Sequence, residues 1–181
     1  MGTGADQNAD LYQQMMIRWN QWQTDILNQP AIQREFSLTQ VLSFRMCHRL
    51  NSLESVGWFV KHIQEEGLLS LQEMRWHQAS DGPIQLRVFT LSASEFGILN
   101  GHHRLVAACL AAHRVSDVSW DDCLSLFVHR PRQETLALWR LSIAEIDPLR
   151  RARYDQLTGA QERLGTLGDY LGDFSLFELD V

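Results

Sequence analysis

The residues best suited to chemistry in this 181-residue chain lie in one short stretch, Asn100–Arg104, which reads Asn-Gly-His-His-Arg. An apolar segment, Phe96–Leu99, precedes it, and a segment rich in alanine and leucine follows. This pattern predicts a strand, a tight turn and a helix, and Gly101 can adopt the positive φ that such a turn requires. The first N–H groups of a helix lack intrahelical partners and, with the helix dipole, favour a bound anion. We therefore predict an anion site, with a phosphate group as the anion.

The side chains of the turn suit phosphate chemistry. Arg104 would add a permanent charge with a planar fork, and a cation at a helix N-terminus opposes the dipole unless an anion offsets it. His102 and His103 could donate hydrogen bonds or act as acids or bases near neutral pH. The alternative is that the turn is an ordinary strand–glycine–helix connection with histidines at its surface. The predicted phosphate-binding residues of the turn are Asn100, Gly101, His102, His103 and Arg104.

Helices and short strands must hold this turn in place. Apolar residues at spacings of three and four predict helices, and alternating apolar residues predict strands. Predicted helices cover Asp10–Asn28, part of Leu42–Leu50, Leu53–Glu66, Arg104–His113, Arg132–Ile146 and one or two segments between Leu149 and Leu171. Predicted strands cover Phe36–Leu42, Arg75–Ala79, Ile84–Leu91, Glu95–Leu99 and Leu124–His129. This arrangement predicts an α+β fold.

Local signals set several boundaries of these elements. Asp10 is the expected N-cap of the first helix, and Pro30 should stop it. Trp19 and Trp22 fall on the apolar stripe of that helix and are interpreted as packing residues, with a homodimer contact as an alternative. The helix over 53–66 should end at Gly67 in the C′ position. Its expected apolar face contains Val56, Phe59, Val60 and Ile63.

Composition restricts the class of protein. The net charge of −6 argues against a protein that coats nucleic acid, although Lys61 is the only lysine and the arginine bias permits local phosphate sites. No apolar run approaches the length of a membrane helix, and the N-terminus lacks the blocks of a signal peptide. We therefore expect a cytoplasmic protein without membrane insertion. The three cysteines form no metal-binding pattern, and Cys47 and Cys109 are expected to be small buried residues.

The stretch Phe96–Ala108, of sequence FGILNGHHRLVAA, resembles the signature of the ParB/sulfiredoxin superfamily, in which a strand leads through Gly-x-x-Arg into a helix of small residues. Glu65–Leu69 also resembles the stretch before that family's central strand. Arg45 stands where the family often places a phosphate-contacting arginine. The resemblance covers about Phe36 to His129. It implies a compact core with a small mixed sheet over residues 31–130, after a flexible start (1–9) and a helix (10–30). A helical extension (131–181) would pack on this core within a single domain.

Members of this superfamily bind nucleotides, hydrolyse ATP or CTP, phosphorylate serine, reduce peroxiredoxins or cut DNA. His102 occupies the place of the sulfiredoxin cysteine, which argues against the redox reaction. In size and in the turn, the chain is similar to plasmid fertility-inhibition proteins of the oncogenic-suppression type. That similarity implies ATPase or DNase activity and a block of conjugative DNA transfer through a type IV secretion system. Components of that system or of a nucleoprotein complex would be partners.

The resulting hypothesis is a phosphohydrolase that uses ATP or another nucleoside triphosphate with Mg²⁺. A carboxylate (Glu35, Glu65 or Glu66) would hold the ion or orient water, and no protein-only metal site is predicted. The predicted catalytic residues are His102, His103, Arg104 and Glu66. Two alternatives remain. One is a nucleotide-sensing module without turnover that docks a partner through Trp19 and Trp22. The other is a DNA-binding regulator, whose expected contacts are Arg150, Arg151 and Arg153.

Overall fold

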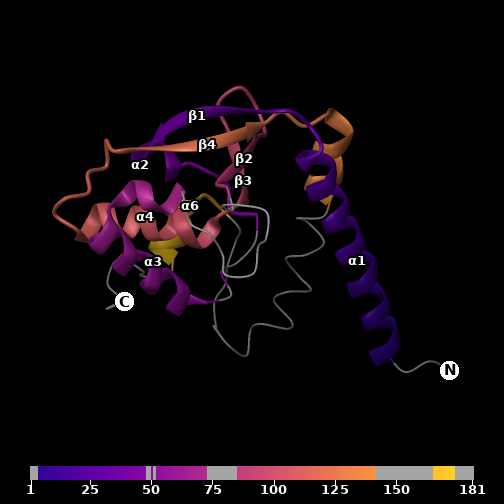
Figure 1. The fold of residues 1–181 in the computed structure, drawn as a ribbon. Coiled ribbons are helices and arrows are strands. Elements are labelled where there is room, and N and C mark those ends of the chain that lie inside the picture. The colour runs from indigo at the N-terminus through magenta and orange to yellow at the C-terminus, as the bar shows by residue number, and fades with distance from the viewer. Residues whose placement is uncertain (1–3, 48–49, 51, 73–84, 142–164, 174–181) are drawn as a thin grey trace, which may run out of the picture. The chain divides into compact units, whose positions relative to one another are not determined.

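The computed structural model describes residues 4–47, 50, 52–72, 85–141 and 165–173 (Figure 1). The chain divides into two compact units. One unit contains residues 31–129 together with 165–173, and it carries the turn at Asn100–Arg104. The other unit contains residues 4–30 and 130–141.

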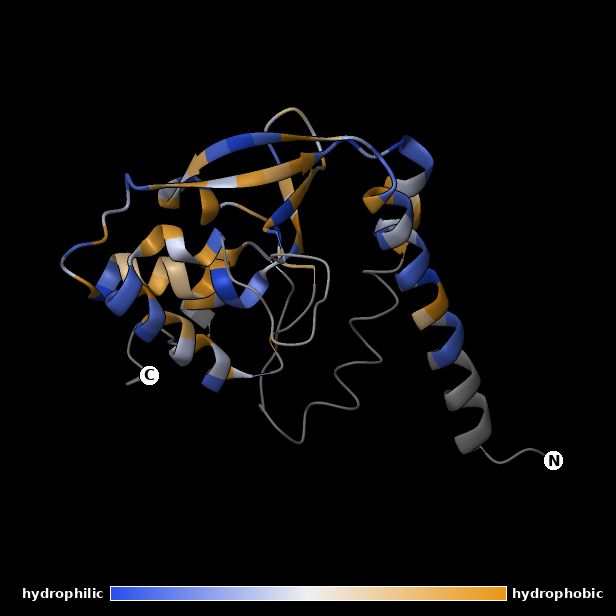
Figure 2. Cartoon of the chain, viewed as in Figure 1, coloured by the Kyte–Doolittle hydropathy of each residue, from blue (hydrophilic) through white to orange (hydrophobic). Residues whose placement is uncertain are grey.

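A mixed sheet of four strands organises the unit that carries the turn. Its order is β1-β4-β2-β3, with β2 parallel to β4 and the other neighbours antiparallel. The strands are β1 (Ala31–Ser37), β2 (Arg87–Thr90), β3 (Phe96–Asn100) and β4 (Cys123–His129). Figure 2 shows that β1 is hydrophilic in its middle and β4 largely hydrophobic, as expected for an edge strand beside a central one. Helices with a small mixed sheet confirm the predicted α+β class.

Helices gather on one side of this sheet (Figure 1). They are α2 (Leu38–Val41), α3 (Leu53–Glu66), α4 (His102–Arg114) and α6 (Leu167–Asp173), with a 3₁₀ segment, η1 (Leu68–Gln72), after α3. The helix α4 is the central one, because every residue from Arg104 to Ala111 is buried. Small side chains at Ala107, Ala108 and Ala111 allow the neighbouring elements to approach it closely.

The prediction for α3 is confirmed at both ends. The Ser52 side chain accepts a hydrogen bond from the Ser55 N–H, which caps the first turn. The helix ends at Glu66 as predicted, and Gly67, expected in the C′ position, is the C-cap residue, with a φ of 87°. The apolar face of the helix is buried, as expected, and comprises Val56, Phe59, Val60 and Ile63.

The segment 31–47 differs from its prediction. Strand β1 starts at Ala31 and stops at Ser37, because Ser37 and Gln40 form a capping box that opens the short helix α2. The helix expected within 42–50 is wrong for the described residues up to 47. Arg45 instead pairs in parallel with Gly97, donating its N–H to Phe96 O at 2.8 Å and accepting from Ile98 N–H at 2.9 Å.

The other expected elements fall close to their predicted places. β2, β3 and β4 lie within or next to the predicted strands, and α4 begins two residues earlier than expected. Residues 133–141 are helical, within the predicted helix over 132–146. The expected strand over 75–79 lies outside the described residues. Of the range 149–171, where one or two helices were expected, residues 149–164 lie outside the described residues, and α6 begins at Leu167 within the rest.

In the second unit, the helix α1 (Gly4–Leu27) begins six residues before the N-cap expected at Asp10 and ends before Pro30. Its residues Trp19 and Trp22 are buried, and their rings meet edge to face with centroids 5.0 Å apart. Their interpretation as packing residues is confirmed. A partner could not dock on these two indoles without first exposing them.

Candidate anion site

The turn between β3 and α4 leaves the start of the helix without a side-chain cap. Gly101 is the N-cap, with φ 97° and ψ 23°, and as a glycine it offers no side chain to cap the first turn. The first intrahelical bond runs from the Leu105 N–H to Gly101 O at 2.9 Å, so the N–H groups of residues 102–104 precede it. A Cβ at Gly101 would lie 2.5 Å from Leu86 Cδ2, so both the conformation and the space require glycine.

Arg104 lies under this turn and is 6% exposed. Its Nη1 donates to Leu71 O at 3.2 Å, and its Nη2 donates to Gln85 O at 3.3 Å. Burial lowers the pKa of Arg104 to about 10. The guanidinium is also 3.3 Å from the position that a Cβ of Gly101 would take. Arg104 therefore places a desolvated positive charge against the turn and joins η1 to the residues that lead into β2.

The two histidines of the turn occupy different environments. His102 is buried, and its Nε2 accepts a hydrogen bond from the Cys47 N–H at 3.3 Å, which anchors the turn to the segment beside β3. His103 is partly buried, and its Nε2 is shielded from solvent without a hydrogen-bond partner among the described residues. Burial lowers the pKa of His103, so this imidazole is neutral at pH 7. Of the two histidines, His103 is the one whose Nε2 has no hydrogen-bond partner among the described residues.

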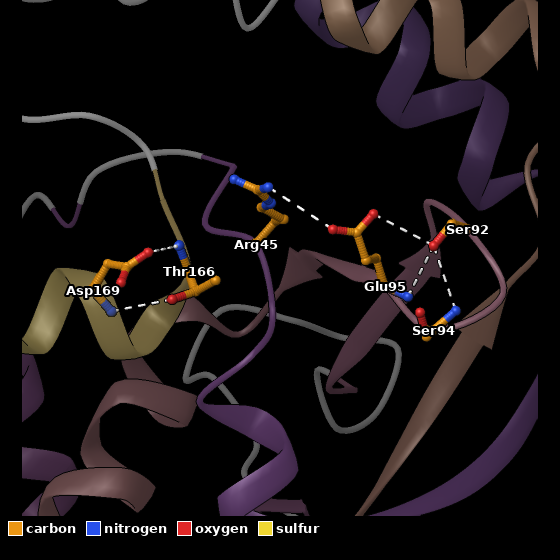
Figure 3. A network of polar contacts seen from close by, with 6 residues as sticks. All are labelled: Arg45, Ser92, Ser94, Glu95, Thr166 and Asp169. Carbon is orange, nitrogen blue, oxygen red and sulfur yellow. Dashed lines mark hydrogen bonds and ion pairs between the residues drawn. The ribbon is translucent and has the colours of Figure 1, made fainter.

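Arg45 is at the other end of β3. It pairs with Gly97, four residues before Gly101, which corresponds to about 13 Å of strand. Its Nη2 lies 3.9 Å from Glu95 Oε1, and both side chains are about half exposed (Figure 3). Glu95 itself belongs to the β2–β3 loop, where Ser92 accepts its backbone N–H at 3.2 Å. The structure therefore does not bring the Arg45 guanidinium to the turn.

The carboxylates expected to help catalysis are dispersed. Glu66 is the exposed last residue of α3, and Glu35 is exposed on β1. The Oε1 atom of Glu65 lies 3.8 Å from Nζ of Lys61, one turn earlier on α3. The described part of the chain contains no group of three histidine, cysteine or acidic residues that could hold a metal ion. These three carboxylates do not form a Mg²⁺ site. Asn100 is exposed at the end of β3 and begins the turn.

The expected DNA contacts Arg150, Arg151 and Arg153 lie outside the described residues, so that prediction stays open. A different basic residue was missed by the sequence analysis. Arg87, at the start of β2, is the register partner of Asn100, and its guanidinium lies over the Phe127 ring and against His129 of β4. The sequence marks Arg87 only as a polar residue in an alternating strand, and nothing in that pattern shows that β2 is the neighbour of β3.

No protein-family model, no curated protein and no solved structure matches the chain. The resemblance to the ParB/sulfiredoxin superfamily thus rests on the sequence signature and stays a prediction. Within the described residues, no helix combines the length and apolar character needed to cross a membrane.

Proposed function

We propose that the chain binds a phosphate group of a nucleotide at the N-terminus of α4. The observation that carries this proposal is the uncapped first turn at Gly101, with the buried guanidinium of Arg104 against it. Three N–H groups and a helix dipole favour an anion at this end, and a phosphate would offset the cost of burying Arg104. Phosphate is favoured over an anion with a single acceptor atom, because its several oxygens can accept hydrogen bonds from several N–H groups at once.

Hydrolysis of a phosphoanhydride or phosphodiester bond is the activity that we propose for the bound nucleotide or DNA. One observation favours it, because His103 is neutral at pH 7 and its Nε2 has no partner among the described residues. A neutral imidazole accepts a proton from an attacking water only if Nε2, which is shielded from solvent in this structure, becomes accessible when the substrate binds. The N–H groups of the α4 N-terminus would stabilise charge on the transferred phosphoryl oxygens. Inhibition of conjugative transfer in the cytoplasm, with secretion-system components as partners, is proposed from the resemblance of Phe96–Ala108 alone.

The binding proposal is best tested by Asn100→Asp, since Arg104 has structural contacts that would confuse its removal. The substitution changes one exposed atom and adds a negative charge at the mouth of the turn. A carboxylate near a helix N-terminus stabilises the helix, so the melting temperature should not fall. The same charge should repel phosphate and weaken ATP binding about tenfold, or about 1.4 kcal/mol, measured by titration calorimetry.

Asn20→Asp is the matched control, because Asn20 is exposed on α1 and undergoes the same chemical change. It should leave ATP affinity unchanged. Equal affinities of Asn100→Asp and the wild type for ATP would contradict the placement of the phosphate. A wild-type protein that binds neither ATP nor inorganic phosphate would contradict the proposal as a whole. Phosphate release that persists in His103→Gln at the wild-type rate would remove His103 as the base.

A further inference from the structure

Arg87 lies on the face of the sheet opposite to α4. Leu126 and Val128 of β4 belong to the hydrophobic core that contains α4, and side chains alternate along a strand, so Phe127 points to the opposite face. Arg87 is the register partner of Phe127 across β2 and β4 and therefore shares that face. A site at Arg87 is thus separate from the turn at Gly101.

Three neutral groups hold the guanidinium of Arg87 in one orientation. Its Nη1 lies 2.8 Å from His129 Nε2, its Nη2 donates to the side-chain oxygen of Gln85, and its Cζ is 5.3 Å from the centre of the Phe127 ring. Because a guanidinium can only donate, His129 Nε2 must be the acceptor nitrogen of a neutral imidazole. The ring of Phe127 adds a cation–π contact. The side chain is therefore oriented before any ligand arrives.

The charge of Arg87 has no counter-ion among the described residues. Its hydrogen bonds go to neutral groups, and no carboxylate in the described ranges lies at ion-pair distance from it. The acid that the strands place on this face is Glu35, which pairs with Ser125 and lies two strands and two residues from Arg87, or about 12 Å away. Partial burial lowers the pKa of Arg87, because water solvates its charged form incompletely.

Three N–H groups of Arg87 remain for a ligand. Nη1 and Nη2 each use one N–H, so each keeps one, and Nε keeps its own. Two such groups in the guanidinium plane match the two oxygens of a carboxylate. The partly exposed ring of Phe127 offers an apolar surface to the carbon stem of the ligand. A carboxylate fits better than a phosphate dianion, because Arg87 is the only cation that the described strands place on this face and Glu35 repels a second negative charge.

We propose that Arg87 is the centre of a second binding site, which takes the carboxylate of a ligand with a short apolar stem, such as a small organic acid or a glutamate side chain. The carboxylate accepts two charge-assisted hydrogen bonds from the guanidinium. Gln85 and His129 orient the guanidinium, and Phe127 contacts the stem. The site goes beyond the proposed function and does not depend on it, because it lies on the other face of the sheet.

The test measures how fast phenylglyoxal, which attacks arginine side chains, modifies Arg87 in the full chain, followed by mass spectrometry of the digested protein. Propionate, added at constant ionic strength and at about four times its dissociation constant, should slow this modification about fivefold. Arg34 is the internal control, because its guanidinium also lies over a phenyl ring, 4.8 Å from the centre of Phe36, but no polar group among the described residues holds it. Its modification should slow about twofold at most, since an exposed guanidinium binds a carboxylate weakly. Propionamide, the neutral analogue, should protect neither arginine.

The two sources of the carboxylate are compared in parallel titrations with propionate and with the α-amide of N-acetylglutamate. The compound that protects Arg87 at the lower concentration identifies the source, and either order supports the site. Equal protection of Arg87 and Arg34, protection by propionamide, or stronger protection by inorganic phosphate than by either carboxylate would overturn the proposal. An Arg87 that phenylglyoxal does not modify even without ligand would be closed to solvent, which would overturn it as well.

A variant provides a second readout. Gln85→Glu preserves the shape of the side chain and places a carboxylate on the Arg87 guanidinium, so the fold should be retained or stabilised. This internal anion should compete with propionate and raise the concentration needed to protect Arg87 about tenfold. Gln14→Glu, at an exposed position of α1, is the matched control and should leave that concentration unchanged. If propionate protects Arg87 equally well in Gln85→Glu and in the wild type, the carboxylate does not bind at this guanidinium and the proposal fails.

Discussion

Two arginines near opposite ends of β3 occupy opposite environments. Arg45 pairs through its backbone with Gly97 at the start of the strand, and its side chain is 45% exposed beside Glu95. Arg104 follows the end of the strand and is 6% exposed, with its guanidinium bonded to the carbonyls of Leu71 and Gln85. The resemblance implies that both contact phosphate, but only Arg104 lies at the turn.

The environment of an arginine determines how much its side chain contributes to the stability of the protein. An exposed ion pair gains little, because water and salt screen it and two long side chains lose freedom. A buried guanidinium loses its hydration, which explains its lowered pKa, and it must be compensated by hydrogen bonds or by an anion. Under the proposed function, Arg104 would therefore contribute both to stability and to phosphate binding, whereas Arg45 should contribute little to either.

The largest expected effect comes from Arg104→Ala. Removal of this side chain deprives the carbonyls of Leu71 and Gln85 of the hydrogen bonds that Arg104 donates, and it leaves space under the turn. A hydrogen bond from a charged group contributes about 1.5–3 kcal/mol to stability. Part of this loss is offset in Arg104→Ala, because the variant no longer has to desolvate a guanidinium when it folds. We expect the free energy of unfolding to fall by about 3 kcal/mol in urea titrations.

Arg104→Lys separates charge from geometry in the same experiment. Lysine retains the charge but cannot reach both carbonyls with one planar group. The Arg104→Lys protein should have an unfolding free energy between those of Arg104→Ala and the wild type. ATP should raise its melting temperature less than it raises that of the wild type. If Arg104→Ala unfolds at the same urea concentration as the wild type, the hydrogen bonds to Leu71 and Gln85 contribute nothing and the contrast with Arg45 fails.

The second effect in size is expected for Gly101→Ala. An alanine at φ 97° is strained by about 1–2 kcal/mol, and its Cβ would meet Leu86 Cδ2 at 2.5 Å. We expect a loss of about 2 kcal/mol in unfolding free energy and a weaker response to ATP. Gly172→Ala is the control, because a Cβ at this exposed helical residue meets nothing within 4 Å. It should be neutral or slightly stabilising.

Much of the fold around this strand could be predicted from the sequence. The spacing of apolar residues in 53–66, together with Gly67, was sufficient to define α3, because that helix is set by one buried face and local caps. The segment 31–47 was largely mispredicted, as a strand over 36–42 and a helix within 42–50, because its strand is an edge strand with exposed residues. Its next residues form a helical turn through the Ser37–Gln40 box. Apolar periodicity does not report either feature.

The candidate site was predictable only in its local part. The turn at Gly101 follows from strand and helix patterns that lie next to each other in the chain. Arg87 could not be found in this way, because its position beside Asn100 depends on the pairing of β2 with β3 and on a register shift. Likewise, the carbonyl partners of Arg104 come from backbone segments that carry no sequence signal. Long-range pairing, rather than composition, decided these contacts.

A smaller effect is expected from the pH dependence of His103. Burial lowers its pKa below 6.5, so the folded protein binds this proton less readily than the unfolded chain does. Its contribution to stability is therefore complete above pH 6.5 and is lost as pH falls through the folded-state pKa. His103→Gln should lose less melting temperature than the wild type between pH 7 and pH 5. If the two melting curves shift in parallel, His103 does not titrate as the structure requires.

The smallest effect is expected for Arg45→Ala, which tests the exposed member of the comparison. Its ion pair with Glu95 spans 3.9 Å between two half-exposed side chains, so its loss should cost less than about 0.5 kcal/mol in unfolding free energy. Glu95→Gln should have the same small effect. The double variant, Arg45→Ala with Glu95→Gln, should lose no more unfolding free energy than the sum of the losses in the two single variants. ATP affinity should remain within twofold of the wild type, because about 13 Å of strand separates Gly97 from Gly101. A tenfold loss of ATP binding in Arg45→Ala would show that the guanidinium leaves Glu95 for the phosphate, and the two ends of β3 would then form one site.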